Sequence, residues 1–281
     1  MLATFVLFWI LQAPSFAYDT ARPLDVRPAG DGAGATVREL TYATLDGGRN
    51  AATLVTPASA RAPHPAVLFV HWYEPPKPTS NRTEFIEEAI ELASSGVVSL
   101  LIDTPWSRED WFPTRDSARD YEFSVGQVKE LRRAIDVLLA QPGIDRTRVG
   151  YVGHDFGAMY GALAVAADPR VTHFVYIAGT RSFSDWFLFA PERKGADRDA
   201  FIARLAPLDP IAYLPKISPR PILMQFGGKD RFVSNEAAAA QADAVRGPKT
   251  VKIYEQAEHE LTAEARQDRL AWLRQQFDAR Q

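Results

Sequence analysis

The chain has 281 residues, 46% of them hydrophobic and 24% charged, a composition that is ordinary for a globular protein and excludes a disordered or fibrous one. It carries 32 Lys and Arg against 35 Asp and Glu, and the resulting net charge of -3 argues against the broad cationic surface that nucleic-acid binding requires. The absence of cysteine excludes disulfides, thiolate metal sites and a cysteine nucleophile.

Residues 1–17 have the pattern of a secretory signal peptide. An apolar run extends from Leu2 to Ala13 and is followed by Ser-Phe-Ala, a small-x-small sequence of the kind that signal peptidases cut. No Lys or Arg precedes this run, so an uncleaved membrane anchor is the alternative, although the run is shorter than the ~20 residues needed to span a bilayer. We expect a secreted or periplasmic protein, not stably inserted in a membrane after cleavage, whose mature part is a single domain over residues 18–281. Its oligomeric state is not indicated.

Downstream of residue 35, short β-branched runs alternate with helical ones, which predicts a mainly parallel sheet of the α/β class with helices on both faces. The eight expected strands cover residues 36–45, 50–57, 65–71, 97–103, 148–154, 173–178, 221–226 and 250–254. The expected helices cover residues 83–95, 121–141, 156–167, 234–245 and 262–278. One long irregular stretch at about 180–220, rich in aromatic residues and proline, indicates a short lid.

The segment 149–161 combines a strand, a Gly-x-Asp-x-Gly turn centred on Asp155, and a helix of small residues. Such a turn forces its central residue into a strained conformation, and side chains at the flanking Gly153 and Gly157 would collide. This arrangement resembles the nucleophile elbow of the α/β-hydrolase family. The resemblance implies the α/β-hydrolase fold over nearly the whole mature chain.

Most members of that family carry Ser where this chain has Asp155. A carboxylate is already ionised at neutral pH and can attack a saturated carbon that bears a leaving group, forming an alkyl ester. The run His-Asp-Phe-Gly resembles the elbow of haloalkane dehalogenases and epoxide hydrolases, which implies a covalent aspartate nucleophile acting on an alkyl halide or epoxide. The runs at 208–211 and 217–221 resemble the dienelactone hydrolase branch instead. An esterase or lactonase with Asp155 as base, and a catalytically silent binding protein, are therefore alternatives.

The family order of nucleophile, acid and histidine implies the partners of the nucleophile. Asp230 follows the expected strand 221–226 and is the expected acid, with Asp185 as the alternative. His259 precedes the last helix and is the expected general base, which would take a proton from the water that attacks the alkylated aspartate. His154, beside the nucleophile, is expected to be structural.

The run that begins at His71 ends the expected strand 65–71, where the family builds its oxyanion hole, and it resembles the motif His-Gly-x-Pro imperfectly. The resemblance implies that the backbone N–H groups of Trp72 and Phe156 stabilise the oxyanion, with Tyr73 as the alternative first donor. We expect a small-molecule substrate, and no nucleic acid, cofactor or metal, since no pair of histidines has ligand spacing. The expected substrate-binding residues, which include candidate donors to the leaving group, are Tyr73, Trp106, Tyr160 and Trp186.

Overall fold

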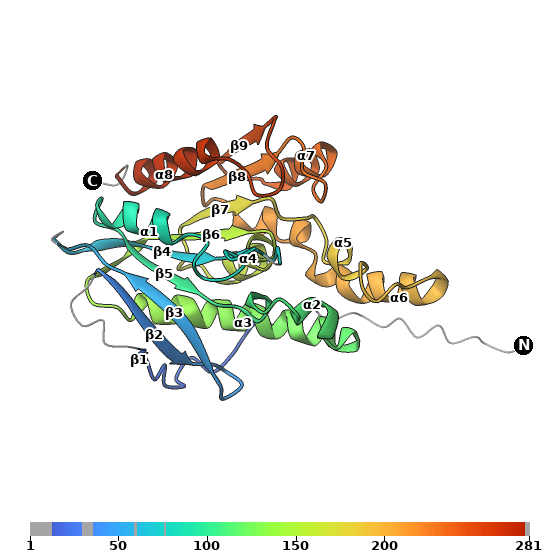
Figure 1. The fold of residues 1–281 in the computed structure, drawn as a ribbon, viewed down its shortest axis with the longest axis horizontal. Coiled ribbons are helices and arrows are strands. Elements are labelled where there is room, and N and C mark those ends of the chain that lie inside the picture. Colours follow the sequence, from blue (N-terminus) through green and yellow to red (C-terminus); the bar gives the residue numbers. More distant parts are fainter. Residues whose placement is uncertain (1–12, 30–35, 59–60, 76, 279–281) are drawn as a thin grey trace, which may run out of the picture.

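The computed structural model describes residues 13–29, 36–58, 61–75 and 77–278. Its strands form one sheet in the order β1-β2-β3-β5-β4-β6-β7-β8-β9 (Figure 1). Pairing is antiparallel from β1 to β5 and parallel from β5 through β4 to β9. The strands are β1 (Arg27–Pro28), β2 (Val37–Ala43), β3 (Arg49–Val55), β4 (His64–Val70), β5 (Val98–Ile102), β6 (Ile144–His154), β7 (His173–Ile177), β8 (Ile222–Gly227) and β9 (Lys249–Tyr254).

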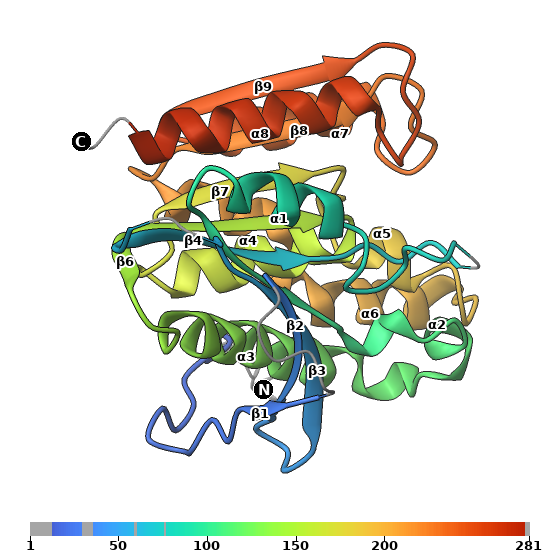
Figure 2. The same ribbon diagram turned by 60° about the vertical axis from the view of Figure 1, so that its left-hand side comes forward.

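Each of the eight predicted strands is present, and within the described ranges one further strand, the two-residue β1, lies at the edge of the sheet. The helices are α1 (Ile86–Ala93), α2 (Trp111–Thr114), α3 (Asp120–Leu139), α4 (Phe156–Ala167), α5 (Ser184–Phe187), α6 (Gly195–Leu205), α7 (Asn235–Ala244) and α8 (Ala263–Asp278). Figures 1 and 2 show α1 and α8 together on one face of the sheet, while α3, α4 and α7 pack on the other.

The central strand β4 shows how the sequence specifies this three-layer arrangement. Its side chains alternate between the two faces, as the two-residue period of a strand requires. Leu68 and Val70 belong to the core under α3 and α4, whereas Val67 and Phe69 belong to the core under α1 and α8. Burying each such side chain stabilises the fold by about 1.5–3 kcal/mol. A near-continuous apolar run is therefore the expected sequence of a strand covered on both faces.

The stretch 180–220 contains more helix than its sequence predicted. It includes α5, α6 and three 3-10 turns at Ala206–Leu208, Pro210–Ala212 and Leu214–Ile217. Figure 1 shows α5 and α6 beyond the carboxyl ends of the parallel strands. Only Phe201 and Leu205 of α6 are buried, so this helix has no continuous apolar stripe that periodicity could detect.

Most of the predicted signal peptide, residues 1–12, lies outside the described residues. Phe16 is described and is buried, with its ring 5.9 Å from that of Tyr213. The Phe16 carbonyl also accepts a 2.6 Å hydrogen bond from Arg132. Among the described residues, no helix is both long and apolar enough to traverse a lipid bilayer.

Candidate active site

Asp155 stands at a sharp turn between the end of β6 and the start of α4. Its φ of 51° and ψ of −116° are unusual for a residue with a side chain, and such strain persists only where the surroundings enforce it. A Cβ at Gly153 would lie 2.3 Å from the Gly157 carbonyl oxygen, and one at Gly157 would lie 2.2 Å from that of Val70. Both glycines are therefore sterically required, and the turn has the geometry expected of a nucleophile elbow.

The two carboxylate oxygens of Asp155 have different surroundings. Oδ2 accepts a 3.1 Å hydrogen bond from the backbone N–H of Tyr73, and the N–H of Phe156 also stabilises the carboxylate. Oδ1 is buried and has no hydrogen-bond partner among the described residues. Burial raises the pKa of Asp155 to about 7, while the charge of His259 and the two N–H groups oppose that rise. One oxygen of the group is thus fixed, and the other is available for chemistry.

His259 lies between the carboxylate of Asp155 and that of Asp230. Its Nδ1 donates a 2.8 Å hydrogen bond to Oδ2 of Asp230, and its Nε2 lies 3.9 Å from Oδ1 of Asp155. Nε2 is buried without a hydrogen-bond partner in the described part of the chain. Burial alone would raise the pKa of Asp230, but the hydrogen bond and charge of His259 outweigh it and keep that pKa below its ordinary value. The alternative acid, Asp185, is exposed on α5 and takes no part in this arrangement.

The structure corrects the expected first oxyanion donor. The N–H of Trp72 donates to Oε2 of Glu84 at 2.8 Å, and it is the next residue, Tyr73, whose N–H donates to Asp155. The sequence motif could not decide between the two because Trp72 stands where the family has Gly. The second expected donor, Phe156, begins α4 beside the carboxylate.

Glu84 supports the site and was not predicted from the sequence. Its Oε1 lies 2.6 Å from Nδ1 of His154, while Nε2 of His154 lies 3.0 Å from the His259 carbonyl oxygen. Burial raises the pKa of Glu84 well above its ordinary value and lowers that of His154 to about 4, so it disfavours the charged form of both side chains. A carbonyl oxygen only accepts hydrogen bonds, so Nε2 of His154 carries the proton that it donates to the His259 carbonyl. His154 is therefore structural, as expected, and it positions the loop that carries His259.

Of the four residues expected to bind substrate, two lie in the core and two lie next to Asp155. Trp106 and Tyr160 are fully buried behind Phe156 and stack on each other with ring centroids 5.2 Å apart. The Trp106 indole donates to the His71 carbonyl, and the Tyr160 hydroxyl is bonded to that of Ser124. The expectation that Trp106 and Tyr160 contact substrate is therefore wrong, because packing places both in the core.

The other two expected residues lie next to the site. The hydroxyl of Tyr73 donates to the Glu109 carbonyl, so this residue faces the nucleophile through its backbone. The indole Nε1 of Trp186 is buried and has no partner among the described residues. Its ring lies 5.4 Å from that of Phe156 and 6.3 Å from that of His259. Trp186 is thus the one of the four with an uncommitted side-chain donor.

Aromatic rings cover the nucleophile, whose carboxylate has no solvent exposure. The rings of Trp186 and Phe232 lie 4.7 Å apart, and Phe232 meets the His259 imidazole edge-on at 4.9 Å. Phe232 and His259 also line a surface groove of about 330 Å³, together with Trp72 and several charged side chains. In the described part of the chain, no group of three or more His, Asp or Glu residues is placed to hold a metal ion.

No protein-family model matches the sequence, and no curated protein matches it significantly. Solved structures do match. Acetyl xylan esterase 1 from a Thermoanaerobacterium species superposes with a TM-score of 0.72 at 17% identity, over 90% of this chain and 88% of that one. An acetyl xylan esterase from a Paenibacillus species superposes with a TM-score of 0.73 at 18% identity, over 90% and 89% of the two chains.

A Klebsiella pneumoniae protein assigned as a dienelactone hydrolase superposes with a TM-score of 0.61 at 17% identity, over 86% of this chain and all of that one. At such identities the likeness establishes the fold alone. The protein therefore has the α/β-hydrolase fold, as the elbow sequence predicted, with a body like that of dienelactone hydrolases, as the runs at 208–211 and 217–221 predicted.

Proposed function

We propose that the protein is a hydrolase in which Asp155 is a covalent nucleophile toward an alkyl halide. The observation that carries the proposal is that the two carboxylate oxygens of Asp155 differ in their hydrogen bonding. Oδ2 is held by the N–H of Tyr73 at 3.1 Å, whereas Oδ1 accepts no hydrogen bond from any described residue and lies 3.9 Å from Nε2 of His259. A carboxylate fixed at one oxygen and free at the other suits attack on a saturated carbon.

In the first step, Oδ1 of Asp155 forms a bond to the carbon as the carbon–halogen bond breaks. The halide leaves with the bonding electron pair, and Asp155 becomes an alkyl ester. The leaving halide needs a hydrogen-bond donor in this buried site, and among the described residues the indole N–H of Trp186 is the buried donor there without a partner. An epoxide would instead need a hydroxyl donor, but the hydroxyls of Tyr73 and Tyr160 are already committed. These contacts favour the halide.

In the second step, Nε2 of His259 takes a proton from water, and the water oxygen attacks the ester carbonyl carbon of Asp155. The negative charge that develops on Oδ2 falls on the oxygen already held by the Tyr73 and Phe156 N–H groups, and each such donor contributes roughly 3 kcal/mol by analogy with oxyanion holes. Asp230 holds the imidazole at 2.8 Å and stabilises its positive charge. Collapse releases the alcohol, which takes the proton, and one water oxygen stays in the carboxylate.

A substrate can reach Asp155 only if the aromatic rings that cover it, those of Phe232 and Trp186, move. Because the carboxylate has no solvent exposure, a substrate arriving from the groove beside His259 must displace the ring of Phe232 or Trp186. Phe232 follows the acid Asp230 by two residues on a turn, so a change of its side-chain rotamer opens the path without altering the sheet.

A second candidate function is hydrolysis of an ester or lactone with Asp155 as general base on water. The raised pKa of about 7 supports it, because a general base works best when its pKa lies near the working pH. The likeness in fold to acetyl xylan esterases and a dienelactone hydrolase also supports it. In this mode no covalent bond forms between the enzyme and the substrate.

The experiment that separates the two is a trap for the alkyl-enzyme. The His259→Gln variant is incubated with 1-bromobutane, and its intact mass is measured. Covalent attack predicts a gain of one butyl group that maps to Asp155 and is missing in Asp155→Asn. The matched control His64→Gln, at a histidine bonded to the Gly96 carbonyl away from the site, turns over like the wild type.

Full turnover of 1-bromobutane by folded His259→Gln would overturn the covalent proposal. Hydrolysis of p-nitrophenyl acetate without any adduct from 1-bromobutane would also overturn it, and would support the esterase function instead. Turnover of neither substrate, nor of styrene oxide, indicates a silent binding protein.

We further propose that the protein is exported, on the pattern of residues 1–17. The amino-terminal residue of protein recovered outside the cytoplasm tests this, and recovery of the uncleaved chain inside the cell contradicts it.

A further inference from the structure

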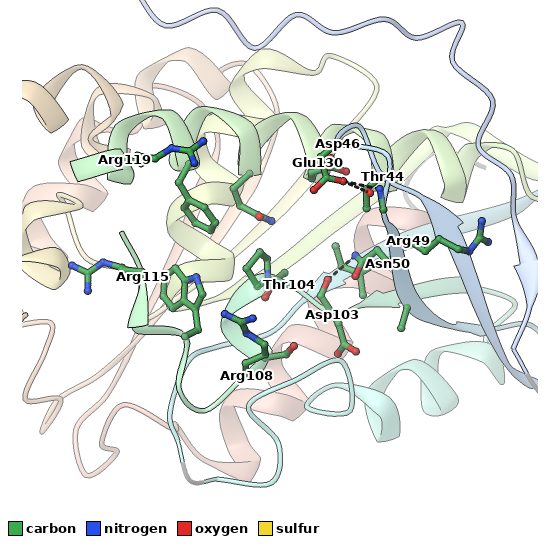
Figure 3. Close-up of a pocket in the computed structure, with 18 of the residues that line it drawn as sticks. Thr44, Asp46, Arg49, Asn50, Asp103, Thr104, Arg108, Arg115, Arg119 and Glu130 are labelled. Carbon is green, nitrogen blue, oxygen red and sulfur yellow. Dashed lines mark hydrogen bonds between the residues drawn. The ribbon is translucent and has the colours of Figure 1, made fainter. Parts of the chain in front are cut away.

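A cleft of about 690 Å³ opens beside α3, and its lining mixes arginines such as Arg108 and Arg119 with acidic residues such as Asp103 and Glu130 (Figure 3). This mixture of charges selects no single class of ligand. A more specific arrangement surrounds Glu84, whose contacts lead to the proposed catalytic residues.

The side chain of Glu84 connects the segments that carry the oxyanion donor and the nucleophile. Glu84 lies two residues before α1, and its side chain is 13% exposed. Its Oε2 accepts the 2.8 Å hydrogen bond from the N–H of Trp72, the residue before the oxyanion donor Tyr73. Its Oε1 lies 2.6 Å from Nδ1 of His154, the residue before the nucleophile. The turn after β4 and the end of β6 therefore meet on one carboxyl group.

His154 extends this connection to the proposed base. Its Nε2 donates a 3.0 Å hydrogen bond to the carbonyl oxygen of His259. The imidazole rings of the two histidines lie 5.3 Å apart, and the indole of Trp72 stacks on His154 at 4.9 Å with an interplanar angle of 16°. Glu84 thus reaches the backbone of His259 through a single side chain. A displacement of Glu84 would act on the oxyanion donor and on the base together.

The contact between Glu84 and His154 contains a hydrogen atom. Nε2 of His154 carries one proton, because the carbonyl that it meets only accepts hydrogen bonds. A bare Nδ1 and an ionised carboxylate oxygen would face each other with lone pairs at 2.6 Å, which is repulsive. Oε2 of Glu84 already accepts the Trp72 N–H. A second proton therefore lies between Oε1 and Nδ1, and with this shared proton the pair bears no net charge.

The surroundings favour retention of the shared proton. The side chain of His154 is 3% exposed, and burial raises the pKa of Glu84 and lowers that of His154. Without the shared proton, Glu84 would be an anion beside a neutral imidazole. The charged groups that act on the two side chains from neighbouring elements are already in close pairs, namely Arg269 with Glu88, His259 with Asp230, and Glu260 with Lys77. Among these described groups, no cation is free to balance an ionised Glu84.

We propose that Glu84 is a positioning residue for the second step of the reaction. The proton that it shares with His154 holds the Tyr73 N–H and the His259 imidazole in place. The inference rests on the proposed function, in which both of these groups act on the alkyl ester of Asp155. Glu84 acts through its neighbours and not on the reacting atoms. Loss of the shared proton should therefore impair hydrolysis of the ester more than its formation.

The test compares Glu84→Leu with Glu84→Gln in single turnovers of 1-bromobutane, followed by the intact mass of the enzyme. In Glu84→Leu, hydrolysis of the butyl-enzyme should slow about tenfold or more, because a misplaced donor and base both act on that step. Formation of the adduct should slow less than about threefold, so the adduct accumulates. Glu84→Gln should stay within about threefold of the wild type in both steps, because its NH2 donates to Nδ1 of His154 and its oxygen accepts the Trp72 N–H.

The matched control is Glu87→Leu in the first turn of α1, where the carboxyl is 75% exposed and contacts Arg266. It should change neither step more than about twofold, as is usual for a surface substitution. Wild-type rates in folded Glu84→Leu, or equal slowing of both steps, would overturn the proposal. A Glu84→Gln variant as slow as Glu84→Leu would also contradict it, because it would show that the carboxylate and not the shared proton is needed.

Nitrogen-15 NMR of the His154 ring at neutral pH gives a readout that does not depend on turnover. After resonance assignment of the labelled proteins, Nδ1 should resonate as a hydrogen-bonded nitrogen in the wild type and in Glu84→Gln. In Glu84→Leu it should resonate as a free ring nitrogen. An identical Nδ1 resonance in all three proteins would mean that no proton is shared, against the proposal. Failure of the wild type to consume 1-bromobutane, together with the expected change at Nδ1, would refute the proposed function while supporting the shared proton.

Discussion

Replacing Asp155 by Asn should stabilise the protein, and the gain should grow with pH. The buried carboxyl has a pKa of about 7 in the folded state against an ordinary 3.8 in the unfolded chain. Each pKa unit corresponds to about 1.4 kcal/mol, so ionising Asp155 costs roughly 4 kcal/mol more in the fold than in the unfolded chain. A neutral Asn avoids this cost and keeps an oxygen to accept the N–H of Tyr73.

The sign follows from proton linkage. Between pH 3.8 and about 7 the folded state binds the proton more tightly than the unfolded chain, so the wild type loses stability as the pH rises. Integrating over the two pKa values gives a difference between Asp155→Asn and wild type of about 1.7 kcal/mol at pH 5 and about 4 kcal/mol at pH 8. Any preference of Asn for positive φ adds a constant that does not depend on pH.

Urea unfolding at pH 5 and pH 8, extrapolated to zero denaturant, measures this difference. The matched control is Asp185→Asn, on the exposed acidic side chain of α5, which should change stability by less than about 0.5 kcal/mol at either pH. A gain that is the same at both pH values, or an Asn variant less stable than wild type at pH 8, would refute the assignment of a desolvated, ionisable carboxyl to this turn.

Three further predictions concern pH dependence, access and the amino terminus. The value of kcat/KM for 1-bromobutane should rise about tenfold per pH unit below pH 7 and level off above it, because only ionised Asp155 attacks; a flat profile from pH 5 to 8 would contradict this. Phe232→Ala should raise kcat/KM for bulky primary bromides several-fold relative to bromoethane by opening the cover, and equal effects on both substrates would show that Phe232 is no gate. A chain beginning at Tyr18 should unfold with a free energy about 2 kcal/mol lower than one beginning at Pro14, because it lacks the buried ring of Phe16; equal urea midpoints would argue against that burial.

The parts of the fold that the sequence predicts are those with a strong local pattern. Strands such as β4 and β5 have apolar runs bounded by turn residues, and helix α3 carries a clear apolar stripe. The elbow is also local, since Gly153 and Gly157 are required by contacts within a few residues and with one neighbouring strand. Helix α6 escaped prediction because its short buried face is interrupted by charged residues.

The parts of the site that the sequence misjudged depend on contacts distant in the chain. Whether Trp72 or Tyr73 donates to the nucleophile is decided by Glu84, whose carboxyl takes the Trp72 N–H. Glu84 in turn meets a histidine 70 residues away, which no spacing rule predicts. Likewise, Trp106 and Tyr160 have the chemistry of ligand contacts, but their stacking behind the elbow follows only from how the helices and loops pack.

The most direct test of covalent catalysis is a single turnover in oxygen-18 water. The wild type is mixed with less than one equivalent of 1-bromobutane and then digested with a protease. The mass of the peptide that contains Asp155 is measured by mass spectrometry. Covalent attack predicts one heavy oxygen in the Asp155 carboxylate and ordinary oxygen in the butanol released. An unlabelled peptide together with labelled butanol would mean that water attacks the substrate directly, and Asp155 would not be the nucleophile.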